Sequence, residues 1–206
     1  MQAPMKIAVA GATGRVGRHV VDVLVERGHA VVSMSRATDV NVITGDGLLA
    51  ALTGVECVID TAGGPEAEEA AATSFFTTSA ANLHRYGEQA GVQRIVAVSI
   101  IGTDRFSAGY CAAKAAHERA LVAGPLPVRI VRAAQFHEFV PQLVDWGTQG
   151  EVGYVGEVRT QLVAARSVAE VLANLITAPA WAAQNGPALE VAGPRVEPAL
   201  RRRRIG

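Results

Sequence analysis

The sequence predicts a three-layer α/β/α fold, in which helices cover both faces of a doubly wound parallel sheet. Short apolar runs rich in valine and isoleucine alternate with longer segments of helical period, as is typical of buried parallel strands joined by crossover helices. With 206 residues, half of them apolar, the chain suits one domain with a substantial core. We expect this domain over residues 1–193, with small additional elements after residue 133, followed by a proline- and arginine-rich tail over 194–206.

Seven of the apolar runs are predicted to be strands. They cover residues 6–10, 30–35, 40–44, 57–61, 94–99, 128–132 and 188–192. Only residues 36–39 separate the second run from the third, which is too short for a crossover helix. We therefore expect the sheet to be trimmed at this edge.

The first helix is predicted directly after the first strand. Val16, Val20, Val23 and Leu24 share one helical face, and Gly28 stands where a helix usually ends. Together with the two flanking strands, this helix forms a βαβ unit.

Two later helices are predicted from spacing and capping. Gly91 ends a long central helix whose inner face is marked by Phe76, Ala80, Leu83, Gly87 and Ala90. The segment from Ser167 to Glu170 reads as a capping box that opens a last helix. Beyond it, Pro194, Pro198 and the basic run 201–204 favour a solvated or disordered end over a phosphate-binding patch.

The composition indicates which kind of partner and which cellular compartment to expect. The chain has 19 basic and 19 acidic side chains, so no charge bias favours nucleic acid or an anionic membrane. We see neither an export signal nor an apolar run near the roughly 18–20 residues needed to span a bilayer. Cys57 and Cys111 lie in unlike contexts and suit reduced thiols. These features predict a cytoplasmic protein with a small-molecule partner.

Three glycines mark the junction of the first strand and the first helix. Gly11 allows a tight exit from the strand, Gly14 lets the backbone approach a pyrophosphate, and Gly17 lets helix and sheet pack closely. Free N–H groups at the start of the helix would face the anion. The spacing is G-x-x-G-x-x-G, a variant of the common dinucleotide motif. We assign cofactor binding to the whole turn: Gly11, Ala12, Thr13, Gly14, Arg15, Val16 and Gly17.

The end of the second strand bears on the choice between NADP(H) and NAD(H). A carboxylate at this point would hold the ribose hydroxyls of NAD, but the chain has Ser35 and Arg36. A hydroxyl and a guanidinium suit the 2′-phosphate of NADP. Asp39 follows closely and keeps NAD(H) as the alternative. Arg15 is either a further phosphate contact or an exposed arginine without a partner.

A tyrosine and a lysine lie four residues apart in the alanine-rich segment 109–118. On a helix, Tyr110 and Lys114 would share one face, and the ammonium could stabilise a phenolate. The spacing alone favours a solvated helix face over a catalytic pair.

With these motifs, the chain resembles the short-chain dehydrogenase/reductase superfamily and its Rossmann-type fold. It is most similar to the atypical, NmrA-like branch of NAD(P)H-binding oxidoreductases. The resemblance extends from Met5 to about Gly193 and includes "SIIGTDR", "RAAQFHEF" and "VAARSVAEVL", in the order of that branch.

The resemblance implies specific roles. Tyr110 would be the acid/base, Lys114 would hold the nicotinamide ribose and lower the pKa of the phenol, and Ser99 would orient the substrate oxygen. Ligands of parallel sheets gather at the carboxyl ends of strands, which adds further residues to the expected cofactor site. These are Ala62, Gly63 and Gly64, Ala134 and Gln135, and also Asp46.

Three functions remain open on these residues. The first is an NADPH-dependent oxidoreductase that transfers hydride to a quinone or a small carbonyl. The second is a non-catalytic, redox-sensing regulator that binds NADP(H). The third, an epimerase or dehydratase acting on a nucleotide-sugar with tightly held NAD, is disfavoured by Ser35 and Arg36.

Other signals are interpreted as structural. "HEFVP" at 137–141 lacks the second histidine of a zinc site, so we expect no metal. His19, His29, His84 and His117 have no ligand spacing and are assigned to the surface or to packing. Phe75, Phe76 and Tyr86 could serve a homodimer interface, but we favour core packing for them.

Overall fold

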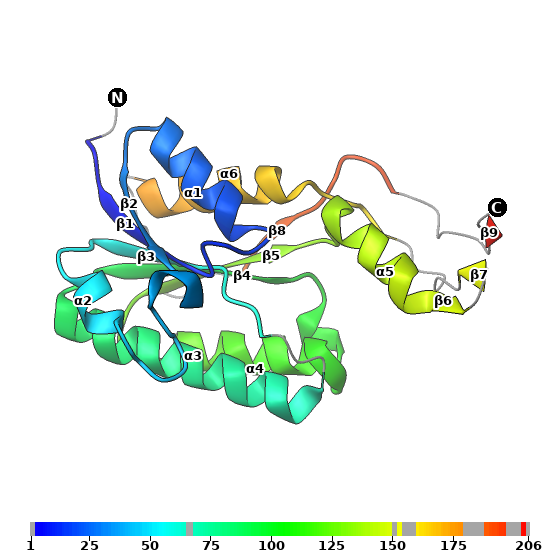
Figure 1. Cartoon of the computed structure of the whole chain (residues 1–206), viewed down its shortest axis with the longest axis horizontal. Coiled ribbons are helices and arrows are strands. Elements are labelled where there is room, and N and C mark those ends of the chain that lie inside the picture. Colours follow the sequence, from blue (N-terminus) through cyan, green and yellow to red (C-terminus); the bar gives the residue numbers. More distant parts are fainter. Residues whose placement is uncertain are drawn as a thin grey trace.

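A computed structural model describes residues 3–64, 68–149, 152–153, 160–178, 188–196 and 203–204. Its centre is a six-stranded parallel sheet in the order β2-β1-β3-β4-β5-β8 (Figure 1). The strands are β1 (Lys6–Ala10), β2 (Ala30–Met34), β3 (Cys57–Asp60), β4 (Arg94–Ile100), β5 (Val128–Ala133) and β8 (Leu189–Val191). The predicted Rossmann-type fold is confirmed.

Helices cover both faces of this sheet (Figure 1). One face carries α1 (Gly17–Glu26) and α6 (Ala165–Thr177). The other carries α2 (Leu48–Leu52), α3 (Glu69–Ala90) and α4 (Gly109–Ala123). Three short 3-10 helices, η1 (Arg36–Thr38), η2 (Thr103–Arg105) and η3 (His137–Phe139), follow strands β2, β4 and β5. The carboxyl ends of these strands therefore open into loops, where a ligand of a parallel sheet would bind.

The alternation of side chains along the strands builds two core layers. On β1, Ile7 and Val9 belong to the layer under α1 and α6, while Ala8 and Ala10 belong to the layer under α2, α3 and α4. Phe76 of α3 is almost fully buried, which supports its assignment to packing. Gly91 ends α3 in a left-handed conformation, with φ of 80°, as predicted.

Residues 40–44 do not form the strand that was predicted. Asn41 instead accepts hydrogen bonds from the amides of Ile43 and Thr44 at 2.9 and 3.4 Å, which closes a turn. The side-chain amide of Asn82 on α3 donates to the carbonyls of Val42 and Ile43, at 2.9 and 2.8 Å. These side-chain hydrogen bonds fasten the segment to α3, and β2 is the end strand of the described sheet on this side.

Helix α6 begins two residues earlier than the predicted capping box. Its N-cap is Ala164, and the amide of Ala165 donates to the carboxylate of Glu138 at 3.0 and 3.2 Å. Ser167 therefore lies inside the helix. A carboxylate from a distant segment satisfies the first amide, which local sequence alone does not reveal.

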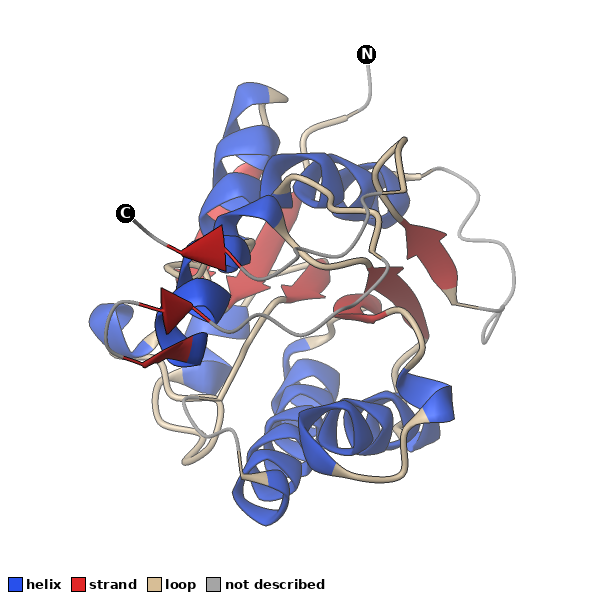
Figure 2. Cartoon of the chain, turned by 90° about the vertical axis from the view of Figure 1, so that its right-hand side faces the viewer, coloured by secondary structure: helices blue, strands red, loops and turns tan. Residues whose placement is uncertain are grey.

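The segment after β5 extends away from the central sheet. It contains α5 (Val140–Gly147) and the short strands β6 (Thr148–Gln149) and β7 (Val152–Gly153). Strand β9 (Arg203–Arg204) returns from the tail and pairs antiparallel with β7, so that a small second sheet forms (Figure 2). This pairing differs from the solvated end expected for 201–204, of which 201–202 lie outside the described residues.

Candidate cofactor and catalytic site

The glycine turn is tight at two positions. Gly11 has φ of 72°, and a Cβ there would lie 2.7 Å from the carbonyl oxygen of Thr61. A Cβ at Gly17 would lie 2.1 Å from the carbonyl oxygen of Gly11. At Gly14 the crowding is milder, with the same oxygen at 3.1 Å. The turn is therefore held close to both α1 and the end of β3.

The start of α1 presents backbone amides without protein acceptors. Within the described residues, nothing accepts a hydrogen bond from the amides of Thr13, Arg15, Val16 or Gly17. The N-cap Val16 supplies no side-chain cap. Unpaired amides and the positive end of the helix dipole together favour an anion such as a pyrophosphate.

The end of β2 lies directly beside this turn. The carbonyl oxygen of Met34 accepts from the amides of Gly11 and Ala12 at 2.9 and 3.3 Å. Ser35 follows as the N-cap of η1. Arg36 is exposed, and its guanidinium has no partner among the described residues. Arg36 thus follows, by two residues, a backbone carbonyl that contacts the glycine turn.

Two acidic residues of the following loop are placed differently. Asp39 is exposed, in a left-handed conformation with φ of 57°. Asp46 is also exposed, and its carboxylate accepts a hydrogen bond from the hydroxyl of Thr44 at 2.5 Å. In the described part of the chain, no contact joins Asp46 to the glycine turn, so its cofactor role stays a prediction.

The loop after β3 links the glycine turn to α4. The hydroxyl of Thr61 donates to the carbonyl of Ala10 at 2.7 Å, and the amide of Ala62 donates to the Asp60 carboxylate at 2.9 Å. A Cβ at Gly63 would lie 4.0 Å from the hydroxyl of Tyr110. The structure therefore brings together the predicted loop residues and the predicted acid/base. Thr61 and Asp60 were not anticipated.

Tyr110 lies in the first turn of α4. Its ring meets the ring of Phe76 edge-on, with centroids 5.6 Å apart, and its hydroxyl has no hydrogen bond within the described residues. Burial raises the pKa of the phenol, and the neighbouring Cys111 thiol adds to the rise. The predicted lowering of this pKa by Lys114 is wrong for this structure, because the ammonium is held elsewhere.

Lys114 points into the protein and is 5% exposed. Its ammonium donates to the carbonyl of Val98 and to Nδ1 of His117, both at 2.9 Å, and lies 4.4 Å from the centroid of the Phe76 ring. Burial lowers its pKa to about 8, against the opposing effect of the Asp60 and Glu118 carboxylates. Two hydrogen bonds and one cation–π contact thus hold the ammonium inside the protein.

His117 and Asp60 complete this buried group. Nε2 of His117 lies 3.1 Å from the carboxylate of Asp60, and each residue is 1% exposed. Burial and the charge of Lys114 lower the pKa of the imidazole. Burial alone would raise the pKa of Asp60, but the hydrogen bond from His117 and the charges nearby hold it below its usual range. From the sequence, His117 was assigned to the surface or to packing, although it lies about one helical turn after Lys114.

Ser99 belongs to a neighbouring polar cluster. Its hydroxyl is buried and lies close to the Glu118 carboxylate without a hydrogen bond of ordinary geometry. Arg132 donates twice to this carboxylate, at 3.0 and 2.7 Å, and the Thr103 hydroxyl donates to it at 3.1 Å. No contact joins Ser99 to Tyr110 among the described residues, so its substrate-orienting role stays a prediction.

The residues after β5 approach the glycine turn from the other side. The amide of Ala134 donates to the carbonyl of Val191 at 2.8 Å, and the carbonyl of Gln135 accepts from Val163 at 3.0 Å. The guanidinium of Arg15 donates to the side chain of Gln142 and lies 5.0 Å from the centroid of the Phe139 ring. Arg15 therefore joins the glycine turn to α5 and is not the partnerless arginine that was considered.

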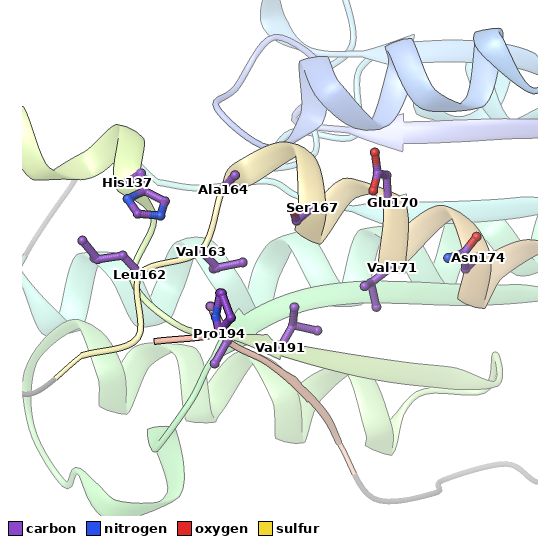
Figure 3. A pocket seen from close by; sticks show the side chains of 12 residues that line it. His137, Leu162, Val163, Ala164, Ser167, Glu170, Val171, Asn174, Val191 and Pro194 are labelled. Carbon is purple, nitrogen blue, oxygen red and sulfur yellow. The ribbon is translucent and has the colours of Figure 1, made fainter. Parts of the chain in front are cut away.

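A hollow of about 450 Å³ lies between α6 and the segment that ends β8 and follows it (Figure 3). His137, Ser167, Glu170 and Asn174 are its polar lining residues. None of the predicted site residues is among the lining residues. Its lining residues Val191 and Val163 are, however, the hydrogen-bond partners of Ala134 and Gln135, so the hollow adjoins the predicted cofactor residues after β5.

Among the residues that the structure describes, no group of three or more His, Cys, Asp or Glu side chains is arranged to hold a metal ion. In the same residues, no helix has both the length and the apolar character to cross a membrane.

Comparison with solved structures shows the fold class. "MoeE5 in complex with UDP-glucose and NAD" matches with a TM-score of 0.76 at 19% identity, over 94% of this chain and 78% of the other. A short-chain dehydrogenase/reductase superfamily protein from Agrobacterium tumefaciens with bound NAD gives 0.69 at 17%, over 94% and 79%. The Citrobacter sp. triphenylmethane reductase complexed with NADP(H) gives 0.64 at 17%, over 94% and 72%. No curated protein matches the chain by sequence.

These solved structures share the predicted Rossmann-type fold with this chain. A family model described as NAD(P)H-binding matches residues 11–179, and the chain belongs to this family. The predicted class of cofactor, a nicotinamide dinucleotide, is confirmed at the level of the family.

Proposed function

We propose that the protein is an NADPH-dependent reductase of a small carbonyl or quinone. The observation that carries the cofactor assignment is the set of amides at the start of α1 that have no acceptor among the described residues, together with the Arg36 guanidinium, which has no partner there. The amides of Thr13, Arg15, Val16 and Gly17 would bind the pyrophosphate. Arg36 and the Ser35 hydroxyl would bind the 2′-phosphate, which a carboxylate in their place would repel.

The direction of the reaction is inferred from Tyr110. When bound, the cofactor supplies hydride to the substrate carbon, and the substrate oxygen then needs a proton. Because burial raises its pKa, the phenol of Tyr110 is protonated at neutral pH and can donate that proton. The resulting phenolate regains a proton from solvent. A phenol with a raised pKa suits reduction better than proton abstraction from an alcohol.

The loop after β3 and Phe76 would shape the space for the substrate. Gly63 leaves room beside the Tyr110 hydroxyl, since a Cβ there would lie 4.0 Å from this oxygen. The edge-on ring of Phe76 fixes the orientation of the phenol.

The experiment combines binding with turnover. Calorimetry should show NADPH binding more tightly than NADH, and a panel of quinones and aldehydes should contain a substrate that oxidises NADPH. Tyr110→Phe should leave NADPH binding intact and reduce kcat by about 10²-fold or more, the usual contribution of a general acid. Absence of NADPH binding by the folded protein would end the cofactor assignment, and unchanged turnover in Tyr110→Phe would end the catalytic one.

One observation favours a second function, a non-catalytic protein that senses the redox state of NADP(H). The ammonium of Lys114 donates to Val98 and His117 and lies over the Phe76 ring, and no hydrogen bond joins it to Tyr110 among the described residues. A sensor requires different affinities for oxidised and reduced cofactor, because only a differential affinity shifts a conformational equilibrium. Different Kd values for NADP⁺ and NADPH, together with no turnover across the panel, would support this function over the reductase.

A further inference from the structure

A chain of three buried ionisable side chains connects β3 to α4. The Lys114 ammonium lies 2.9 Å from Nδ1 of His117, and Nε2 of the same ring lies 3.1 Å from the Asp60 carboxylate. All three residues are at least nine-tenths buried. Asp60 also accepts the amide of Ala62 at 2.9 Å, so its two oxygens connect the loop after β3 with the imidazole.

The partners determine where the protons lie. An ammonium can only donate, so Nδ1 of His117 must be the acceptor. A carboxylate can only accept, so Nε2 of the same ring must carry the proton. The imidazole is therefore neutral, in its Nε2–H tautomer, between a cation and an anion. The lowered pKa of His117 agrees with a neutral imidazole, and the lowered pKa of Asp60 agrees with an ionised carboxylate.

The surroundings of Lys114 explain why it needs such support. Strand β4 contributes the Val98 carbonyl, α3 contributes the Phe76 ring, β3 contributes Asp60, and α4 itself contributes His117 and Glu118. Arg132 is paired with Glu118 at 2.7 Å, so that carboxylate is already balanced. Asp60 is thus the principal counter-charge of the buried ammonium, and it reaches the ammonium through His117.

We propose that His117 is a positioning residue for Lys114: braced by Asp60, its imidazole holds the ammonium at the carboxyl ends of β3 and β4. This inference rests on the proposed function, which places the nicotinamide at that end of the sheet. Of the three partners of the ammonium, the Phe76 ring is the weakest acceptor. A ribose hydroxyl would replace this ring, while His117 and Val98 keep their hydrogen bonds.

The sequence provides a direct way to observe this ammonium. The chain contains only two lysines, Lys6 and Lys114. With ¹³C-labelled lysine, the two Cε signals can be followed by NMR across a pH titration of the protein without cofactor, and Lys6→Arg assigns them. We expect the Lys114 signal to titrate near its lowered pKa of about 8.

Three near-isosteric variants separate the contacts. Asp60→Asn removes the anion and should lower the pKa of Lys114 further, since Asp60 raises it in the structure. His117→Gln retains a donor toward Asp60 but removes the ring acceptor, and should lower this pKa as well. His117→Asn places an oxygen near the position of Nδ1, and should keep it closest to the wild type.

A second readout distinguishes positioning from a merely structural role. Asp60→Asn and His117→Gln should weaken NADPH binding about tenfold more at pH 8 than at pH 6.5. The reason is that Lys114 in these variants loses its proton at a lower pH than Lys114 in the wild type. A structural role would lower Tm without this pH dependence. The proposal is overturned if Lys114 titrates at the ordinary pKa of a lysine. It is also overturned if the pKa of Lys114 is the same in all three variants while they stay folded. If NADPH does not bind the wild type, the proposed function fails. The lysine titration then still tests whether Asp60 and His117 hold the ammonium of Lys114.

Discussion

The carbonyl oxygen of Gly11 occupies the space in which a side chain at Gly17 would begin. A Cβ at Gly17 would lie 2.1 Å from that oxygen and 2.8 Å from the Thr61 hydroxyl. We expect Gly17→Ala to cost roughly 1–3 kcal/mol of unfolding free energy, as overpacking usually does, because backbone must move. The displaced turn should also weaken NADPH binding. Denaturant unfolding and calorimetry measure the two effects.

Gly63→Ala is the matched control for this change. A Cβ at Gly63 would meet only the Tyr110 hydroxyl, at the ordinary contact distance of 4.0 Å, and its backbone is not in the left-handed region. Its unfolding free energy should stay within about 0.5 kcal/mol of the wild type. Equal stability of Gly17→Ala and Gly63→Ala would contradict the packing argument.

Arg36 provides the prediction about cofactor choice. Its guanidinium has no partner among the described residues, so Arg36→Ala removes no protein contact there. We expect the Kd for NADPH to rise about tenfold, the effect of losing a charge-assisted hydrogen bond at an exposed site, and the Kd for NADH to stay unchanged. Parallel calorimetry with both nucleotides measures this. Equal weakening of both would place Arg36 outside the 2′-phosphate site.

The fold could be predicted from the sequence because buried parallel strands carry a continuous apolar signal. Six of the seven predicted strands are found, with ends that agree or differ by one residue. The exception, 40–44, is equally apolar, but Gly45 and Gly47 adopt left-handed conformations and Asn41 closes a turn. The start of α6 was misplaced for a related reason, since its cap comes from Glu138, a residue distant in sequence.

The pH dependence of turnover separates the role of Tyr110 from that of Lys114. Because burial raises the pKa of the phenol, Tyr110 stays protonated up to alkaline pH and should not itself limit activity near neutrality. We expect wild-type kcat to fall instead as pH rises through the Lys114 pKa of about 8. A pH–rate profile checks this. A profile that is flat from pH 7 to pH 9 would exclude a required charge on Lys114.

The candidate site was only partly predictable. The glycine turn is encoded locally, and its three glycines are read from spacing alone. The spatial relation of Tyr110 to Lys114 is not encoded locally. The direction of the lysine side chain on α4 depends on His117 and on Asp60, which lies on β3. The i, i+4 rule places both residues on one helix face, but a buried anion and the Phe76 ring draw the ammonium inward. His117 was missed because a single histidine has no spacing pattern to identify it.

Lys114→Met should change how stability depends on pH. The pKa of Lys114 is about 8 in the folded protein against an ordinary 10.5, so between these values the unfolded chain binds more protons and the stability of the wild type rises with pH. Methionine removes this rise. The unfolding free energy of the wild type relative to Lys114→Met should thus increase by at most about 3 kcal/mol from pH 8 to pH 10.5, measured by denaturant unfolding. Lys6, whose ammonium donates to the Thr53 carbonyl at an exposed site, provides the control. A comparable increase in Lys6→Met would show that the effect does not come from burial of Lys114.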